Sequence, residues 1–249
     1  MRYVTVQTNC VECGKAVTLQ MPKRMVESVM NSGLFQSYPY CCPECEIVRE
    51  ERKIRREEEE YAGQKRREFA EHMEESGIPE EYRVLLPPVP AVADWIAKNS
   101  ARNILLHGPT GAGKSTSAGY TARMMISAGK RVKWYALASL LDEWREARKS
   151  DDPDGDTSHL FYRLERHDVL ILDECDKPIN TESTQECMFR LIEDVTNGTS
   201  RAKLWMLGNF YRGSIEDIFG NGEAARRRFN EKFACAQIMP DGKIRKIKL

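Results

Sequence analysis

The residues from Gly108 to Thr116 have the types and spacing that bind a nucleoside triphosphate. Glycines at 108, 111 and 113 precede Lys114 and Ser115, which is the pattern of a phosphate-binding loop. Glycine allows sharp turns and a close approach of backbone N–H groups to an anion, and a following helix adds its positive N-terminal end. Lys114 is expected to reach the β- and γ-phosphates, and Ser115 to bind Mg²⁺. A chance glycine turn is disfavoured because every defining position is filled, so ATP or GTP should bind at Gly108, Pro109, Thr110, Gly111, Ala112, Gly113, Lys114, Ser115 and Thr116.

An apolar run that ends in two acids adds the means of hydrolysis. Residues 169–172 are Val-Leu-Ile-Leu, and Asp173 and Glu174 follow them. Four apolar residues predict a strand that is buried on both faces. Asp173 suits the Mg²⁺ shell, and Glu174 suits orientation of the attacking water in an in-line phosphoryl transfer. Such runs are common by chance, but this one follows a phosphate loop at ordinary spacing, so it predicts a Walker B element.

Four of the eight cysteines form two C-x-x-C pairs, Cys10 with Cys13 and Cys42 with Cys45, with 28 residues between the pairs. Each pair can present two thiolates to one tetrahedral Zn²⁺ ion. A redox motif or an iron–sulfur site is the alternative, and Cys41 could replace a neighbour as ligand. Since a unit of about 45 residues rarely buries enough surface to fold unaided, the metal is expected to support folding. The remaining cysteines are expected to be ordinary buried residues: Cys175, Cys187 and Cys235.

Two later polar positions could complete the nucleotide site. Residues 202–208 predict a strand that ends at Asn209, whose amide could contact the γ-phosphate or the attacking water, or could simply cap a turn. Arg226, Arg227 and Arg228 lie on a predicted helix, where neighbours are about 100° apart and cannot all face one way. One or two of them could reach the nucleotide of a neighbouring subunit, which would complete the site only in an oligomer. Contact with DNA phosphates or a solvated face are the alternatives.

Strands and helices alternate around these residues, which predicts an α/β fold with a parallel sheet flanked by helices. The D-x-D-x-D run at Asp152, Asp154 and Asp156 is not a calcium loop, because Thr157 occupies the required glycine position and Arg163 that of the closing glutamate. The other predicted elements are a helix within Met21–Ser32, strands at 104–106 and 131–135, helices at 116–128 and 139–149 with Ser139 as N-cap, and a polar loop at 150–159.

The composition bounds the organisation of the chain. Its 249 residues, 41% of them apolar, leave room for one nucleotide-binding domain and a small appendage. The formal net charge of zero offers no general attraction for nucleic acid. The sequence lacks an apolar run of about 18 residues and a signal-peptide core, so we expect a soluble cytoplasmic protein without a membrane partner.

The segment between the cysteines and the phosphate loop is highly charged. Opposite charges four residues apart predict a solvent-exposed helix. Ile47, Ile54 and Tyr61 recur every seven residues, but the second apolar position of a coiled-coil heptad is mainly charged, which favours a spacer over self-association. Gly77 and the prolines of 87–90 should end this segment. The expected domains are a zinc-ribbon-like module at 1–48, a charged helical linker at 49–76 and an ATPase domain at 77–249.

These motifs together resemble the AAA+ ATPases of the DnaC-type helicase loaders and the related IstB-type transposition helpers. The resemblance covers about 170 residues and rests on the I-P-x-x-Y-R lead-in at 78–83, a helix at Asp94-Trp95, G-P-T-G-A-G-K-S, L-I-L-D-E, the strand that ends at Asn209, and I-F-G at 218–220 before the arginine helix. It implies that Asn209 is a sensor and that Arg228, just before Phe229, is the finger. The sequence departs from the family where Cys175-Asp176-Lys177-Pro178 follows the acids, and Arg245 represents the C-terminal sensor arginine poorly.

The resemblance also implies partners. Loaders of this type have a separate helicase-binding module, sometimes zinc-bound, and Cys10–Cys45 would take that place. The implied function is an ATP-dependent loader of a hexameric replicative helicase onto single-stranded DNA during replication initiation, acting as a homo-oligomer with ATP at its subunit interfaces. The alternative is a transposition regulator that binds duplex DNA and recruits a transposase. A small-molecule kinase is disfavoured, because no lid or acceptor pocket can be located in the sequence.

Overall fold

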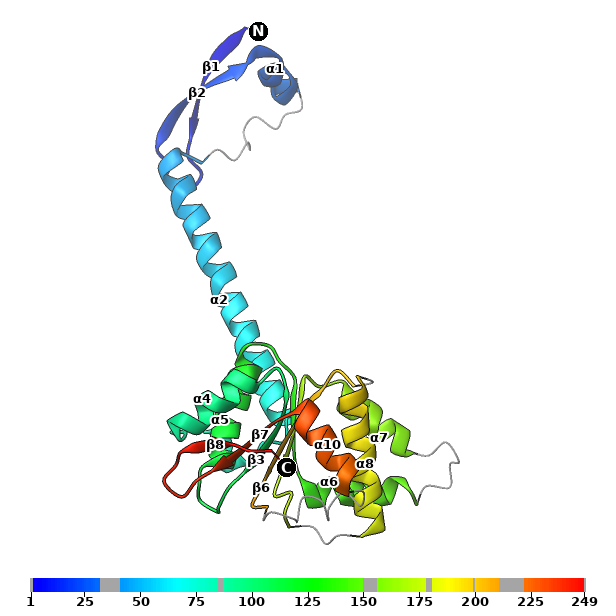
Figure 1. The fold of residues 1–249 in the computed structure, drawn as a ribbon. Helices are drawn as coiled ribbons and strands as arrows, with labels where there is room; N and C mark the ends of the chain where they lie inside the picture. The colour runs from blue at the N-terminus through cyan, green and yellow to red at the C-terminus, as the bar shows by residue number, and fades with distance from the viewer. Residues whose placement is uncertain are drawn as a thin grey trace. The chain divides into compact units, whose positions relative to one another are not determined.

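The computed structural model describes residues 2–31, 41–84, 87–149, 156–177, 181–198, 200–210 and 222–248. The chain divides into two compact units, Met1–Arg66 and Arg67–Leu249 (Figure 1). Among the described helices, none is both long enough and apolar enough to cross a membrane.

The first unit is built on an antiparallel hairpin. Strands β1 (Tyr3–Asn9) and β2 (Ala16–Pro22) pair along their whole length, and helix α1 (Lys23–Asn31) follows directly. The predicted helix start at Met21 is wrong, because Met21 pairs with Val4 as part of β2. Alternate residues of both strands are half-buried, as expected for a ribbon with one covered face.

Helix α2 (Pro43–Glu75) is a charged helix of 33 residues. Its first turn contains Glu44 and Glu46, whose charge is favourable at the positive end of a helix. Along the part that belongs to the first unit, Ile54 and Tyr61 are exposed. The helix ends before Gly77, which has a φ of 69° and lies so close to strand β4 that a Cβ would stand 2.9 Å from the Trp134 carbonyl oxygen. Only glycine fits that conformation and that space.

The second unit contains a six-stranded sheet in the order β4-β5-β6-β3-β7-β8. Neighbouring strands are parallel except β7 and β8, which are antiparallel. The predicted α/β fold with a parallel sheet is therefore confirmed. The strands are β3 (Asn103–His107), β4 (Val132–Ala136), β5 (Val169–Asp173), β6 (Lys203–Gly208), β7 (Phe233–Ile238) and β8 (Ile244–Lys246).

The central strands are buried on both faces. In β5, Val169 and Ile171 belong to one apolar core, whereas Leu170 and Leu172 belong to the other. β3 and β6 alternate in the same way. Successive side chains of a strand point to opposite faces, so two cores require a nearly continuous apolar run. Each fully buried aliphatic side chain contributes about 1.5–3 kcal/mol to this packing.

Helices cover both faces of the sheet (Figure 1). One core takes apolar residues from α4 and α5, and the other from α6, α7, α8 and α10. Besides the end of α2, the described helices of this unit are α3 (Glu80–Arg83), α4 (Pro90–Asn99), α5 (Lys114–Ser127), α6 (Leu137–Ala147), α7 (Asp156–Glu165), α8 (Glu182–Asn197) and α10 (Gly222–Lys232).

Three details differ from the predictions. Ser139 is not an N-cap, because α6 begins at Leu137 after Ala136. The predicted loop at 150–159 is helical from Asp156 onwards. Pro90, one of the prolines expected to end the charged segment, is the first residue of α4, where its missing N–H has no helical partner to lose. Arg245 lies on β8 opposite Gln237. The I-F-G motif at 218–220, like Asp152 and Asp154, lies outside the described residues.

Candidate functional site

The phosphate loop joins the carboxyl end of β3 to the first turn of α5. Gly111 and Gly113 have φ values of 78° and 80°, a region that disfavours side chains. A Cβ at Gly113 would lie 2.4 Å from a methyl carbon of Val89, and one at Gly108 would lie 3.0 Å from Cβ of Ile238. Neighbouring residues therefore leave no room for a side chain at Gly108 or Gly113.

Lys114 points back over this loop. Its Nζ donates hydrogen bonds to the carbonyl oxygens of Gly108, at 2.7 Å, and Pro109, at 2.9 Å. Burial lowers the pKa of Lys114, and the nearby charges of Asp173 and Asp176 oppose this shift. The ammonium group thus lies on the loop and near the carboxylates of Asp173 and Asp176.

Asp173 and Ser115 meet at the other side of the loop. Asp173 is the last residue of β5 and only 8% exposed. Burial raises the pKa of its carboxyl group, while hydrogen bonds from Ser115 and from the Glu174 N–H lower it. The structure thus brings together the serine and the aspartate that the sequence assigns to one Mg²⁺ ion.

Glu174 lies in a tight turn directly after β5. Outside glycine, it is the one described residue with a positive φ, 56°, an uncommon conformation that merits a functional explanation. Its backbone oxygen accepts a hydrogen bond from the Lys177 N–H at 3.0 Å. Its carboxylate forms an ion pair with the Lys177 ammonium group. The side chain is exposed to solvent, where water is available to it.

Asn209 follows β6, which lies between β3 and β5 in the sheet. This order places Asn209 between the phosphate loop and the two acids. Its backbone N–H donates to Asp176 Oδ1 at 2.9 Å. Neither Asp176 nor Lys177 belongs to a motif with an expected role, and their signal in the sequence is that charged residues continue beyond the two acids.

Tyr82 is a further neighbour of the site. In the sequence it stands only within the I-P-x-x-Y-R motif at 78–83, with no role of its own. Its ring packs on Trp134 with centroids 5.7 Å apart. A Cβ on Gly119 would lie 2.8 Å from Cβ of Tyr82, so α3 approaches α5 as closely as glycine permits. Burial and Glu81 raise the pKa of Tyr82, and a hydrogen bond with Ser115 lowers it. The tyrosine thus links α3 to the first turn of α5.

The arginine helix presents its members differently. Arg228 forms an ion pair with Glu193 of α8 at 3.2 Å and lies over the Phe189 ring, 5.0 Å from its centroid. Arg227 pairs with Glu231 one turn later on the same helix. The Arg228 side chain is 28% exposed and that of Arg227 is 79% exposed. Arg228 is therefore held within its own subunit.

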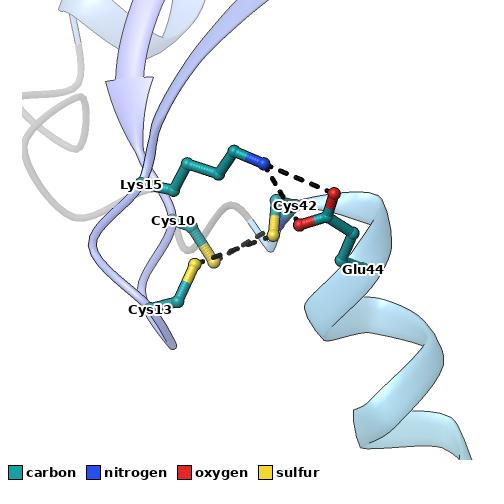
Figure 2. A network of polar contacts seen from close by, with 5 residues as sticks. All are labelled: Cys10, Cys13, Lys15, Cys42 and Glu44. Carbon is teal, nitrogen blue, oxygen red and sulfur yellow. Dashed lines mark hydrogen bonds and ion pairs between the residues drawn. The ribbon is translucent and has the colours of Figure 1, made fainter.

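The two cysteine pairs converge in the first unit. The hairpin turn after β1 positions Cys10 and Cys13, and the start of α2 positions Cys42 and Cys45. The four Sγ atoms lie within 4.8 Å of one another, and Cys41 is not part of this set. Figure 2 shows the sulfurs of Cys10, Cys13 and Cys42 facing one another beside the ion pair of Lys15 with Glu44.

Backbone geometry prepares this cluster. The Cys10 N–H donates to the Lys15 carbonyl oxygen at 2.8 Å and the Gly14 N–H to the Cys10 carbonyl oxygen at 2.9 Å, which closes the turn. The Cys42 N–H points at Cys10 Sγ from 3.3 Å. Such backbone hydrogen bonds lower the pKa of Cys10 to about 6, which favours the thiolate form that binds metals.

The comparisons with known proteins concern the second unit above all. The profile of the IstB-like ATP binding protein family matches residues 46–202. A protein of Sinorhizobium fredii (strain NBRC 101917 / NGR234), described as an insertion sequence ATP-binding protein, is 28% identical over 115 residues, or 46% of this chain. The match spans 37% of that relative's length.

Solved structures are similar at low identity. They include the crystal structure of the DnaC helicase loader, with 14% identity, a TM-score of 0.45, and coverage of 61% of this chain and 86% of that one. AMPPCP-bound DnaA from Aquifex aeolicus shares 18% identity at a TM-score of 0.47, with coverage of 59% and 44%. Since the family profile covers more than half of the chain, including the phosphate loop and the acids after β5, the chain belongs to the IstB-like ATP-binding protein family.

Proposed function

We propose that this protein is an AAA+ ATPase that converts ATP and water to ADP and phosphate at the carboxyl edge of the sheet. The meeting of Ser115 with the buried Asp173, beside Lys114, is the observation that supports this proposal most directly. A hydroxyl and a carboxylate are ligands that Mg²⁺ prefers, and a lysine next to them can neutralise phosphate charge.

Each residue has a distinct task in this proposal. The loop N–H groups and Lys114 bind the phosphates, which replace the loop carbonyls as partners of the ammonium group. Ser115 and Asp173 hold Mg²⁺, which neutralises charge on the β- and γ-oxygens when bound. Glu174 orients the attacking water, and the Asn209 amide holds that water or the γ-phosphate.

Lys114→Ala and Glu174→Gln should separate binding from turnover. The first removes a charge-assisted contact, which corresponds to about 10- to 100-fold weaker ATP binding. The second keeps binding but lowers turnover by about 100-fold or more, because a neutral amide polarises the attacking water far less than a carboxylate does. Fluorescent-nucleotide titration and phosphate release measure the two steps. Wild-type turnover by Glu174→Gln would show that its assigned role is wrong.

We also propose that Arg228 acts on the nucleotide of an adjacent protomer in a homo-oligomer. Phosphoryl transfer needs positive charge around the γ-phosphate, and Lys114 is the basic side chain that the structure shows bonded to the loop. To reach that nucleotide, the Arg228 side chain would have to break its ion pair with Glu193. Arg226 and Arg227 are the alternatives on the same helix.

Mixed oligomers test this arrangement. Arg228→Ala subunits keep an intact Walker site and Lys114→Ala subunits keep an intact Arg228, so mixing two inactive variants should restore part of the ATPase activity. Glu193→Ala is the matched control, because it breaks the same ion pair but leaves the arginine, and it should remain active. Two results would contradict the assignment to Arg228: a mixture that assembles but stays inactive, or normal hydrolysis by Arg228→Ala alone. In either case the arginine finger would be Arg226 or Arg227, or no arginine would act in trans.

The cysteine cluster fits one zinc ion, which we propose as a structural metal of the first unit. Tetrahedral Zn²⁺ with Zn–S bonds near 2.3 Å requires sulfurs about 3.8 Å apart. The Cys13 and Cys42 sulfurs are 3.8 Å apart, and all four Sγ atoms fall within 4.8 Å. The ion would join the hairpin turn to the start of α2.

Cys42→Ser should therefore abolish binding of one zinc per chain, whereas Cys41→Ser, its direct neighbour, should retain it. Metal analysis of the full chain purified without chelators measures the stoichiometry, and circular dichroism after chelation measures the structural contribution. A wild-type chain that holds no zinc would remove the site. Loss of zinc in Cys41→Ser together with its retention in Cys42→Ser would show that Cys41, and not Cys42, is the fourth ligand.

For the partner, we propose a hexameric replicative helicase that binds the first unit and is loaded onto single-stranded DNA. The motif resemblance to helicase loaders and the separate cysteine unit support this assignment. The relative from an insertion sequence favours the second candidate, a regulator that binds duplex DNA and recruits a transposase.

Reconstitution with the partners encoded in the same genome discriminates between the two. The full chain with ATP should increase helicase retained on circular single-stranded DNA, and Lys114→Ala should not. Recruitment of the transposase to duplex DNA, with no effect on the helicase, would replace the first candidate with the second.

A further inference from the structure

The turn that follows the two acids is attached to the end of β6 at two points. The Cys175 N–H donates to the Leu207 carbonyl oxygen at 3.0 Å. The Asp176 carboxylate then accepts the backbone N–H of Asn209 at 2.9 Å. These two contacts fix the turn after Glu174 to the end of β6 and to Asn209.

The space around this contact is closely fitted. A Cβ at Gly208 would lie 3.0 Å from Asp176 Oδ1 and 2.8 Å from the Phe210 ring. The carboxylate therefore occupies the position that a side chain at 208 would need. Phe210, the residue after Asn209, is itself buried, so Asn209 has a hydrogen bond on its N–H and a packed ring next to it in the chain.

We propose that Asp176 is a positioning residue for Asn209, fixing the end of β6 so that the Asn209 amide faces the reacting phosphate. The inference rests on the proposed role of Asn209 in hydrolysis and adds the group that places it. Because Asp176 follows Glu174 by two residues, one short turn sets the positions of the water-orienting glutamate and the sensor asparagine together. Displacement of a reacting group by about 1 Å can reduce turnover about 100-fold, so a single hydrogen bond at this point matters.

A second effect of Asp176 has to be separated from positioning. Its negative charge acts on both Lys114 and His107, so its removal changes the electrostatics of the phosphate loop as well. Asp176→Asn removes the charge but retains an oxygen that accepts the Asn209 N–H. Asp176→Ala removes both.

A double-mutant cycle tests the proposal with the full chain. Asp176→Ala should lower kcat about tenfold or more while nucleotide affinity stays within about threefold of the wild type. Asn209→Ala should lower kcat similarly. In the Asn209→Ala background, Asp176→Ala should change kcat by less than about twofold, because the group that it positions has already been removed.

Asp176→Asn should keep kcat within about threefold of the wild type, and thermal unfolding should show that every variant folds. Equal losses from Asp176→Ala in both backgrounds, or an Asp176→Asn variant as inactive as Asp176→Ala, would overturn the positioning role. Normal turnover in Asn209→Ala would overturn it as well. A wild-type chain without ATPase activity would instead contradict the proposed function itself.

Discussion

Burial of the parallel strands on both faces is the constraint on which the rest of the second unit depends. Inside such a strand every side chain enters one core or the other, so polar chemistry can begin only where the strand ends. β3, β6 and β5 are neighbours and parallel, and their carboxyl ends therefore meet at one edge. The phosphate loop, Asn209 and the two acids follow these three ends, which is why residues about 100 positions apart in sequence form one site.

Local patterns made the main parts of this arrangement predictable. The phosphate loop requires particular residue types because its backbone is tightly packed, as the filled space beside Gly113 shows. The apolar run before Asp173 follows from double burial. The two cysteine pairs are local turns that each bring two sulfurs together, and the four sulfurs converge within 4.8 Å of one another. In each case the physical requirement acts within a few neighbouring residues, so the sequence displays it directly.

Other parts depend on contacts between distant segments, and no local pattern reveals them. The bond between Asp176 and the Asn209 N–H joins two loops that come together only once β5 and β6 have paired. Tyr82 meets Ser115 because α3 packs against Gly119, which a reading of either segment alone could not show. The ion pair between Arg228 on α10 and Glu193 on α8 likewise joins two segments that are distant in the sequence. The cap prediction at Ser139 is wrong for the same reason. Leu137 and Leu140 are both buried in the core, so α6 begins at Leu137, two residues before the serine.

The family match and the structure divide the molecule in a consistent way. The matched residues, 46–202, include the phosphate loop, Asp173 and Glu174, but not the four cysteines, Asn209 or Arg228. Phosphate binding makes the same physical demands on a loop whatever process the nucleotide serves, so the matched region reports on ATP binding and says little about the partner. Recognition of a partner depends instead on surfaces, and the cysteine unit is a separate compact body with a hairpin and a helix of its own. Among the described residues, the two apolar cores that enclose the sheet contain no residue of the cysteine unit.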